Sequence, residues 1–294
     1  MCVRARAVED PHRDNKHEEG ETPIVSMDYA YMEEEEGAKQ GLPILVIKDH
    51  MSKYMTSTAV LNKGGGCSYA IKSAARDIHK LLGYKKIILR SDQEPAMIDF
   101  KNKLKKLLHH ELQVMIEDTP VGDSKAAGNI ENANKNMQAF VRTYKLAVEA
   151  RVGGEIPVDH KIMPWIIKHA SAMKNRLHVG KDGMTAVRRL KGRNFSKPIC
   201  EIGECIWYCK SKTAGKNKAR SRWESGIWLG IRDESGEVIV GTSSGVVKCR
   251  SVRRKPTHEE RWNRVQLDEM LGTPWEPVPG FTSDEIPILS LIHI

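Results

Sequence analysis

The sequence lacks a run of apolar residues long enough to cross a membrane, and its first residues lack the apolar stretch of a signal peptide. Spanning a bilayer takes about 20 mostly apolar residues, and a signal peptide needs an apolar centre. The six cysteines have no regular spacing, which favours reduced thiols over a disulfide framework. These absences exclude a membrane-spanning or secreted protein, so we expect an intracellular protein without a membrane partner.

Cysteine pairs with the CxxC spacing of a zinc site are also missing. Four of the cysteines gather in the last third of the chain: Cys200, Cys205, Cys209 and Cys249. Because side chains alternate along a strand, Cys205 and Cys209 would share one face with Trp207. We interpret the four as buried thiols and expect no zinc in this chain.

Positive charge exceeds negative charge in this sequence. It has 47 Lys and Arg residues against 38 Asp and Glu residues, a net charge of +9 and a pI of about 9.2. This balance favours a polyanionic partner such as nucleic acid, although a basic soluble protein without such a partner fits the charge equally well. A chain of 294 residues has room for about two domains.

Apolar patterns divide the chain into four parts. Residues 1–22 are polar and lack periodicity, so we interpret them as an extended arm. Over residues 23–195 the pattern predicts three strands, then alternating helices and strands, then long helices. Over residues 199–256, short β-rich runs between Gly and Ser turns predict a small β-domain. Residues 257–294 are rich in Pro and Glu and are expected to form a flexible tail.

Three acidic residues stand out by their positions in the predicted elements. Asp28 lies in the first strand, Asp92 directly follows the apolar run KKIILRS, and Glu131 lies near the start of a long helix. Carboxylates suit Mg²⁺ and Mn²⁺, and two such ions about 3.5–4 Å apart can activate a nucleophile and stabilise a leaving oxygen at phosphorus. Taken alone, the three acids fit solvated turns equally well. Asp49, at the end of the second strand, fits a turn or cap, with assistance to the metals as the alternative.

The motifs around these acids follow one another in a characteristic order. IVSMDYAYM and LVIKDHMSKYM are strands with an Asp, IILRSDQEPAM has a Ser-Asp pair after an apolar strand, and AAGNIENANKNMQ has a Glu on a helix after small residues. AMKNRLHVGKDGMTAVRRLKGR and WESGIWLGI follow downstream. In this order the motifs resemble the retroviral and retrotransposon integrases of the ribonuclease H-like superfamily, in particular the copia-type branch, which are parts of a Pol polyprotein. The resemblance covers most of the chain.

The resemblance implies an α/β fold with a ribonuclease H-like mixed five-stranded sheet flanked by helices, followed by a small all-β, SH3-like domain. It also implies a DDE-type polynucleotidyl transferase that performs 3′-end processing and DNA strand transfer for a retroelement. Asp28, Asp92 and Glu131 would be the catalytic residues and the ligands of two Mg²⁺ or Mn²⁺ ions. The implied partners are DNA, as element ends and target, and further copies of this chain in a homo-oligomer that acts in the nucleus.

The sequence departs from that family in two places. Gln93 and Glu94 follow the second Asp, where the family commonly has Asn-Gly or a similar pair. A zinc module usually precedes the core, and here only Cys2 and the basic residues after it resemble its end. These departures leave two alternatives open: a nuclease of ribonuclease H type, and a catalytically inactive, domesticated relic that only binds nucleic acid.

Basic residues predict where nucleic acid would be contacted. Lys135 lies one helical turn from Glu131, and a stretch without acids lies between Ile206 and Trp223. The predicted contacts of the β-domain are Lys210, Lys212, Lys216, Lys218, Arg220, Arg222, Arg253 and Arg254. We interpret the aromatic residues that flank them as barrel core rather than as base-stacking platforms: Trp207, Tyr208, Trp223 and Trp228.

Overall fold

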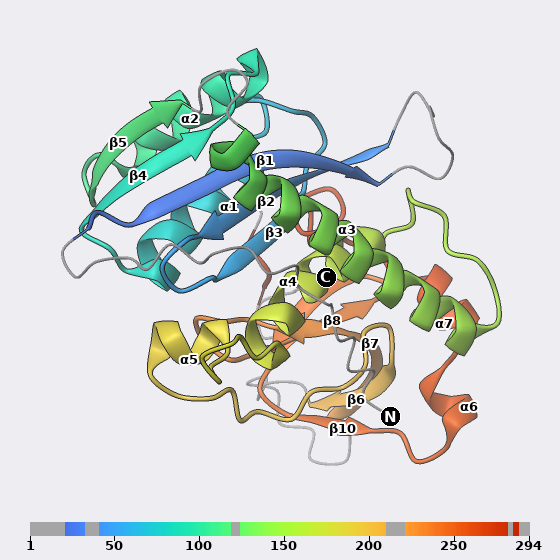
Figure 1. Ribbon diagram of the computed structural model, residues 1–294. Coiled ribbons are helices and arrows are strands. Elements are labelled where there is room, and N and C mark those ends of the chain that lie inside the picture. The colour runs from blue at the N-terminus through green and yellow to red at the C-terminus, as the bar shows by residue number, and fades with distance from the viewer. Residues whose placement is uncertain (1–20, 33–40, 119–123, 210–220, 282–284, 288–294) are drawn as a thin grey trace.

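The computed structural model describes residues 21–32, 41–118, 124–209, 221–281 and 285–287. Two five-stranded sheets with helices packed on them make up this part of the chain (Figure 1). Among the described residues, no helix is both long and apolar enough to cross a bilayer.

The first sheet has the strand order β3-β2-β1-β4-β5. Its strands are β1 (Ile24–Met32), β2 (Leu42–Asp49), β3 (Met55–Ala59), β4 (Lys86–Ser91) and β5 (Gln113–Asp118). The first three strands pair antiparallel, whereas β4 pairs parallel with both β1 and β5. Parallel neighbours need a long crossover connection, and the chain supplies a helical segment before β4 and another before β5. The expected mixed five-stranded sheet flanked by helices is confirmed.

Helices cover both faces of this sheet. On one face lie α1 (Ser68–Arg76), its continuation as the π-helical turn η1 (Asp77–Leu82), and α2 (Pro95–Leu108); on the other lie α3 (Ser124–Val152) and α4 (Met163–Leu177). Strand alternation explains the division: Met27 and Tyr29 of β1 pack with the first group, whereas Ala30 and Met32 pack with the second. The side chain of Asp28, between Met27 and Tyr29, therefore projects toward α3.

The second sheet is antiparallel throughout, with the order β10-β6-β7-β8-β9. Its strands are β6 (Cys205–Cys209), β7 (Trp223–Ile231), β8 (Val238–Thr242), β9 (Gly245–Cys249) and β10 (Val252–Arg254). Short β-runs separated by turns predicted an all-β unit here, and the antiparallel sheet agrees with that much of the expectation. The short helix α5 (Ala186–Lys191) precedes it in the chain.

One continuous core joins the two sheets. Buried side chains of α3 and α4 pack on β1 and β2 on one side and on β7 and β8 on the other. Trp165 of α4 and Trp228 of β7 are almost fully buried in it, and His169 lies between the rings of Tyr144 and Trp228. Figure 1 shows α3 running past both sheets. The division into domains at about residue 199 stays a prediction, because this core crosses it.

The segment after Lys255 packs against the second sheet. It forms α6 (His258–Arg261) and α7 (Arg264–Asp268), and Leu267 and Met270 are buried in the shared core. Backbone N–H groups of β9 donate hydrogen bonds to carbonyl oxygens of Pro277 and Pro287. The described part of residues 257–294 therefore differs from the flexible tail we expected, because its few apolar side chains and its backbone find partners on the sheet.

Candidate functional site

Asp28 and Asp92 lie level with each other at two neighbouring inner strands of the first sheet, at the end of the sheet where β4 stops. We call this end the site edge of the sheet. β1 and β4 run parallel, with Ser26 of β1 paired with Arg90 of β4. Continuing this register by two residues brings Asp28 beside Asp92, which directly follows the last residue of β4. The sequence predicted that these two acids would meet, and the parallel pairing is what brings them together.

The carboxyl group of Asp28 has a pKa raised to about 6. Burial is the main cause, because a charged group loses water there, and the negative charges of Asp92 and Glu94 raise the pKa further. Two hydrogen bonds oppose this rise: the Tyr29 backbone N–H donates to Oδ1 over 2.7 Å, and Asn134 Nδ2 donates to Oδ2 over 2.7 Å. Asp28 is thus a carboxylate whose charge is poorly compensated in the free protein.

Asn134 brings α3 to the site edge, and sequence reasoning missed it. While its Nδ2 bonds to Asp28, its Oδ1 is buried and has no hydrogen-bond partner. The signal that could have found it is its spacing, because a residue three positions after Glu131 shares a helix face with it. Glu131 itself is exposed on α3. In the described part of the chain, no group of three or more His, Cys, Asp or Glu side chains lies close enough to hold a metal ion.

The donor types at the site edge fit a divalent cation. Two carboxylates repel each other when both are charged, as the raised pKa of Asp28 reflects, and a bound cation would remove that repulsion. Oδ1 of Asn134 is a further oxygen of the kind that Mg²⁺ and Mn²⁺ bind. Asp28 and Asp92 are therefore the residues that would hold a metal, with Glu131 on the adjoining helix.

Gln93 and Glu94, the pair that differs from the integrases the sequence resembles, have different surroundings. Gln93 is exposed. Glu94 stands at the start of α2, its backbone N–H donates to Asp92 Oδ1 over 3.3 Å, and its carboxylate is held by Lys63 Nζ at 2.7 and 3.1 Å. Glu94 thus forms an ion pair with a lysine from the segment after β3.

Asp49 makes a turn rather than a metal site. Its side chain is fully buried and accepts hydrogen bonds from the backbone N–H and the hydroxyl of Ser52, from the backbone N–H of Met51 and from the hydroxyl of Tyr84. These donors occupy both carboxylate oxygens. The turn interpretation of Asp49 is confirmed.

The predicted nucleic-acid contacts are dispersed over the surface. Lys135 is exposed on α3, Arg222 is exposed just before β7, and Arg253 is exposed on β10. Five predicted residues lie outside the described residues: Lys210, Lys212, Lys216, Lys218 and Arg220. The structure leaves the role of all of these side chains as a prediction.

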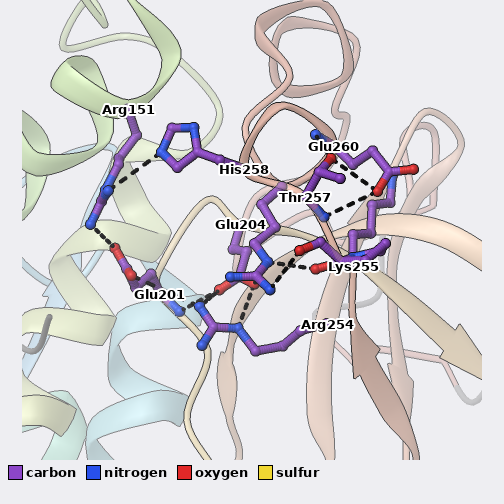
Figure 2. Close-up of polar contacts among 10 residues, drawn as sticks. Arg151, Glu201, Glu204, Arg254, Lys255, Thr257, His258 and Glu260 are labelled. Atoms are coloured by element: carbon purple, nitrogen blue, oxygen red, sulfur yellow. Dashed lines mark hydrogen bonds and ion pairs between the residues drawn. The ribbon is translucent and has the colours of Figure 1, made fainter.

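Arg254 has a carboxylate partner inside the protein. Its Nε and Nη2 donate to the two carboxylate oxygens of Glu204, at 2.7 and 2.8 Å, and the side chain of Glu204 is fully buried (Figure 2). A buried carboxylate needs a counter-ion, and the paired geometry of the guanidinium meets that need. A phosphate would have to compete with Glu204 for Arg254.

Figure 2 also shows that this ion pair belongs to a larger polar cluster. Arg151, near the end of α3, lies 3.2 Å from Glu201 and 3.5 Å from Nε2 of His258 in α6. The cluster therefore links α3 to the segment before β6 and to the helices after β10.

The aromatic residues of the second sheet do not all lie in its core. Trp228 and Tyr208 are buried, as expected, but Trp207 is 38% exposed and Trp223 is half-buried. The interpretation of Trp207 as barrel core is therefore wrong. Alternation along β6 turns Tyr208 inward and Trp207 outward.

Comparison with known proteins finds similar solved structures, three of which follow, while no family model and no curated protein matches the chain. The HTLV-2 integrase catalytic core domain in complex with magnesium is similar in its trimeric form (TM-score 0.41, 17% identity, 57% of this chain and 95% of that one). Its dimeric form gives a TM-score of 0.40 and 16% identity, over 58% and 95% of the two chains. A simian T-cell lymphotropic virus intasome in complex with PP2A regulatory subunit B56 gamma gives a TM-score of 0.42 and 14% identity, over 80% of this chain and 81% of that chain. Because the TM-scores are below 0.5 and the identities are below 25%, the functional assignment rests on the chain's own residues.

Proposed function

We propose that this chain is a retroelement integrase of the ribonuclease H-like, DDE type, which processes the 3′ ends of element DNA and joins them to target DNA. The observation that carries the proposal is the pairing of β1 with β4, which brings Asp28 level with Asp92. The copia-type motifs, the net positive charge and the antiparallel second sheet support it.

Asp28 and Asp92 would hold the divalent cations, and Glu131 would complete the ligand set from α3. Bound Mg²⁺ or Mn²⁺ supplies activation of a water or 3′ hydroxyl and stabilisation of the leaving oxygen. The protein side chains position these ions, and Asn134 orients Asp28 by its hydrogen bond. Basic side chains hold the DNA, and the chain acts as a homo-oligomer in the nucleus.

A strand-transfer assay tests the proposal directly. The full chain is incubated with Mg²⁺, a DNA duplex that ends in a free 3′ hydroxyl and a circular target, and joined products are separated by size. Asp92→Asn should abolish joining and leave DNA affinity unchanged, because Asp92 is exposed and an Asn side chain keeps the Oδ1 that accepts from the Glu94 backbone N–H. Glu117→Gln, another exposed acid in the same sheet, is the matched control and should join normally.

Each other outcome selects one of the alternatives. Hydrolysis of the DNA without joining would indicate a nuclease of ribonuclease H type. Equal products from wild type and Asp92→Asn would remove the catalytic assignment and leave a protein that only binds nucleic acid.

A further inference from the structure

Three neighbouring strands of the second sheet present tryptophan and basic side chains on one face. Strand register places Arg253 of β10 opposite Trp207 of β6, and Trp207 opposite Ser225 of β7. Directly opposed residues project from the same face of a sheet. Trp223 lies two residues before Ser225 and shares that face. We call the surface formed by Trp207, Trp223 and Arg253 the tryptophan face, and the side chain of Lys255 lies buried beside it.

Each ring of the tryptophan face already has a cation over it. The guanidinium carbon of Arg253 lies 4.6 Å from the centre of the Trp223 ring, and Lys255 Nζ lies 5.0 Å from the centre of the Trp207 ring. Cations gather at aromatic faces because the π electrons are negative there. Trp207 remains 38% exposed beside these charges. An exposed tryptophan flanked by cations is suited to a flat, anionic partner.

Carboxylates of the same strands are turned away from the tryptophan face. Glu224 is the only acidic residue of β6, β7 and β10, and it accepts a hydrogen bond of 2.8 Å from the hydroxyl of Tyr208 on the opposite face. Arg254 also points to that opposite face, toward Glu204. The sequence that joins Cys209 to Trp223 contains basic residues and no acidic ones. Within β6, β7 and β10, the charges that share a face with the two rings are therefore positive.

We propose that the tryptophan face binds an unpaired stretch of a nucleic-acid strand, with a base stacked on Trp207 and an adjoining phosphate paired with Arg253. Every base has a π face, so aromatic rings beside cations hold single strands without reading their sequence. Inside a duplex the bases cover one another and offer no such face. The surface thus prefers single strands and frayed ends to continuous duplex. The tryptophan face lies on the second sheet, whereas Asp28 and Asp92 lie on the first. Binding of a single strand there can therefore be tested separately from catalysis.

Fluorescence anisotropy of the full chain in EDTA, where no metal-dependent chemistry proceeds, tests this site. The probes are a labelled thymidine oligonucleotide and a blunt duplex of the same length. Trp207→Ala should lower affinity for the single strand about ten-fold, the effect of losing one stacked base, and leave duplex affinity unchanged. Trp207→Tyr should keep most of the affinity, because a smaller ring still stacks.

The matched control is Trp262→Ala. Trp262 is half-buried and has the guanidinium of Arg151 5.5 Å from its ring centre, but it belongs to the cluster beside α3. Its removal should leave both affinities unchanged. Arg253→Gln should weaken binding and reduce the slope of affinity against salt concentration by about one ion.

Three results would overturn the stacking site: a Trp207→Ala protein that binds like wild type, an equal loss for single strand and duplex, or a Trp207→Tyr protein as weak as Trp207→Ala. Thermal unfolding of each variant establishes that it is folded at the assay temperature. Loss of strand joining in Asp92→Asn is measured separately, so failure of the integrase proposal and failure of the stacking site give different results.

Discussion

Asn134 ties α3 to β1 by donating a 2.7 Å hydrogen bond from Nδ2 to Asp28 Oδ2. Burial raises the pKa of Asp28 to about 6, and this bond opposes the rise because it favours the charged carboxylate. We expect Asn134→Ala to move the pKa above that value and to shift the onset of Mg²⁺ binding to higher pH. Calorimetric titrations across pH measure the shift. Asn132→Ala, on the same helix and exposed, is the control, and an unmoved Asn134→Ala profile would contradict the prediction.

Asp28 should destabilise the folded protein at neutral pH. Its pKa of about 6 in the folded protein exceeds the 3.8 of an unperturbed Asp. Its favourable contribution to stability is therefore complete below pH 3.8 and is lost as pH rises through about 6. Asp28→Asn should therefore unfold with a free energy about 2 kcal/mol higher than wild type at pH 7, and the gain should vanish near pH 4. Urea denaturation at both pH values checks this. A gain that is the same at the two pH values would exclude titration as its cause.

The Arg254–Glu204 pair should contribute to stability rather than to DNA binding. Glu204→Gln removes the charge that Arg254 faces, and breaking such a pair costs about 2–3 kcal/mol when one partner stays partly exposed. The control is Glu201→Gln, because Glu201 is 39% exposed and pairs with Arg151 at the surface, where the cost is under about 1 kcal/mol. Urea denaturation compares the two. Equal costs would show that the burial of Glu204 is irrelevant.

Lys101 and Asp118 should respond unequally to substitution. Lys101 of α2 is 1% exposed and is paired with Asp118 at the end of β5, whose side chain is 44% exposed. Asp118→Asn leaves a buried ammonium without its partner and should cost about 3–5 kcal/mol. Lys101→Met instead releases Asp118 to water and fills the space with apolar atoms, so stability should change by less than about 1.5 kcal/mol. Thermal unfolding measures both, and the reverse order would contradict the assignment.

His169 should make the fold sensitive to acid. Burial between Tyr144 and Trp228, together with the charge of Arg176, lowers its pKa to about 3. In the unfolded chain the pKa of a histidine is 6.5, so the stability that neutral His169 contributes is complete above pH 6.5 and is lost as pH falls toward 3. His169→Phe should flatten this decline between pH 6 and pH 4. Urea denaturation at several pH values measures the decline. If the free energy of unfolding falls equally with pH in His169→Phe and in wild type, the prediction is wrong.

The first sheet could be predicted from sequence because its signals are local. Alternation marks the strands, helical periodicity marks α1 to α4, and Asp92 directly follows a strand, so its place at the site edge needs no knowledge of distant contacts. Asp28 and Asp92 could then be placed together once β1 and β4 were assumed to run parallel. The position of Glu131 relative to them depends on the docking of α3, which no local pattern fixes.

The remaining features depend on partners far apart in the sequence. Arg254 finds Glu204, fifty residues earlier, only because β10 pairs with β6 in a particular register. The inward and outward directions of Tyr208 and Trp207 depend on the same register, and a shift by one residue would exchange them. Two apolar residues, Leu267 and Met270, are too few to predict a packed segment from sequence. They are buried because the second sheet offers an apolar surface on which they pack.

The length of α3 gives the molecule a mechanical property. Its 29 residues correspond to a rod of about 43 Å. Asn134 contacts Asp28, and Arg151, about 25 Å further along the helix, contacts Glu201. Both sheets pack on this rod, so we expect a tilt of the second sheet to displace Asn134 and, with it, Asp28. If the tryptophan face binds a strand as proposed, α3 is the element that joins that event to the carboxylates of the first sheet.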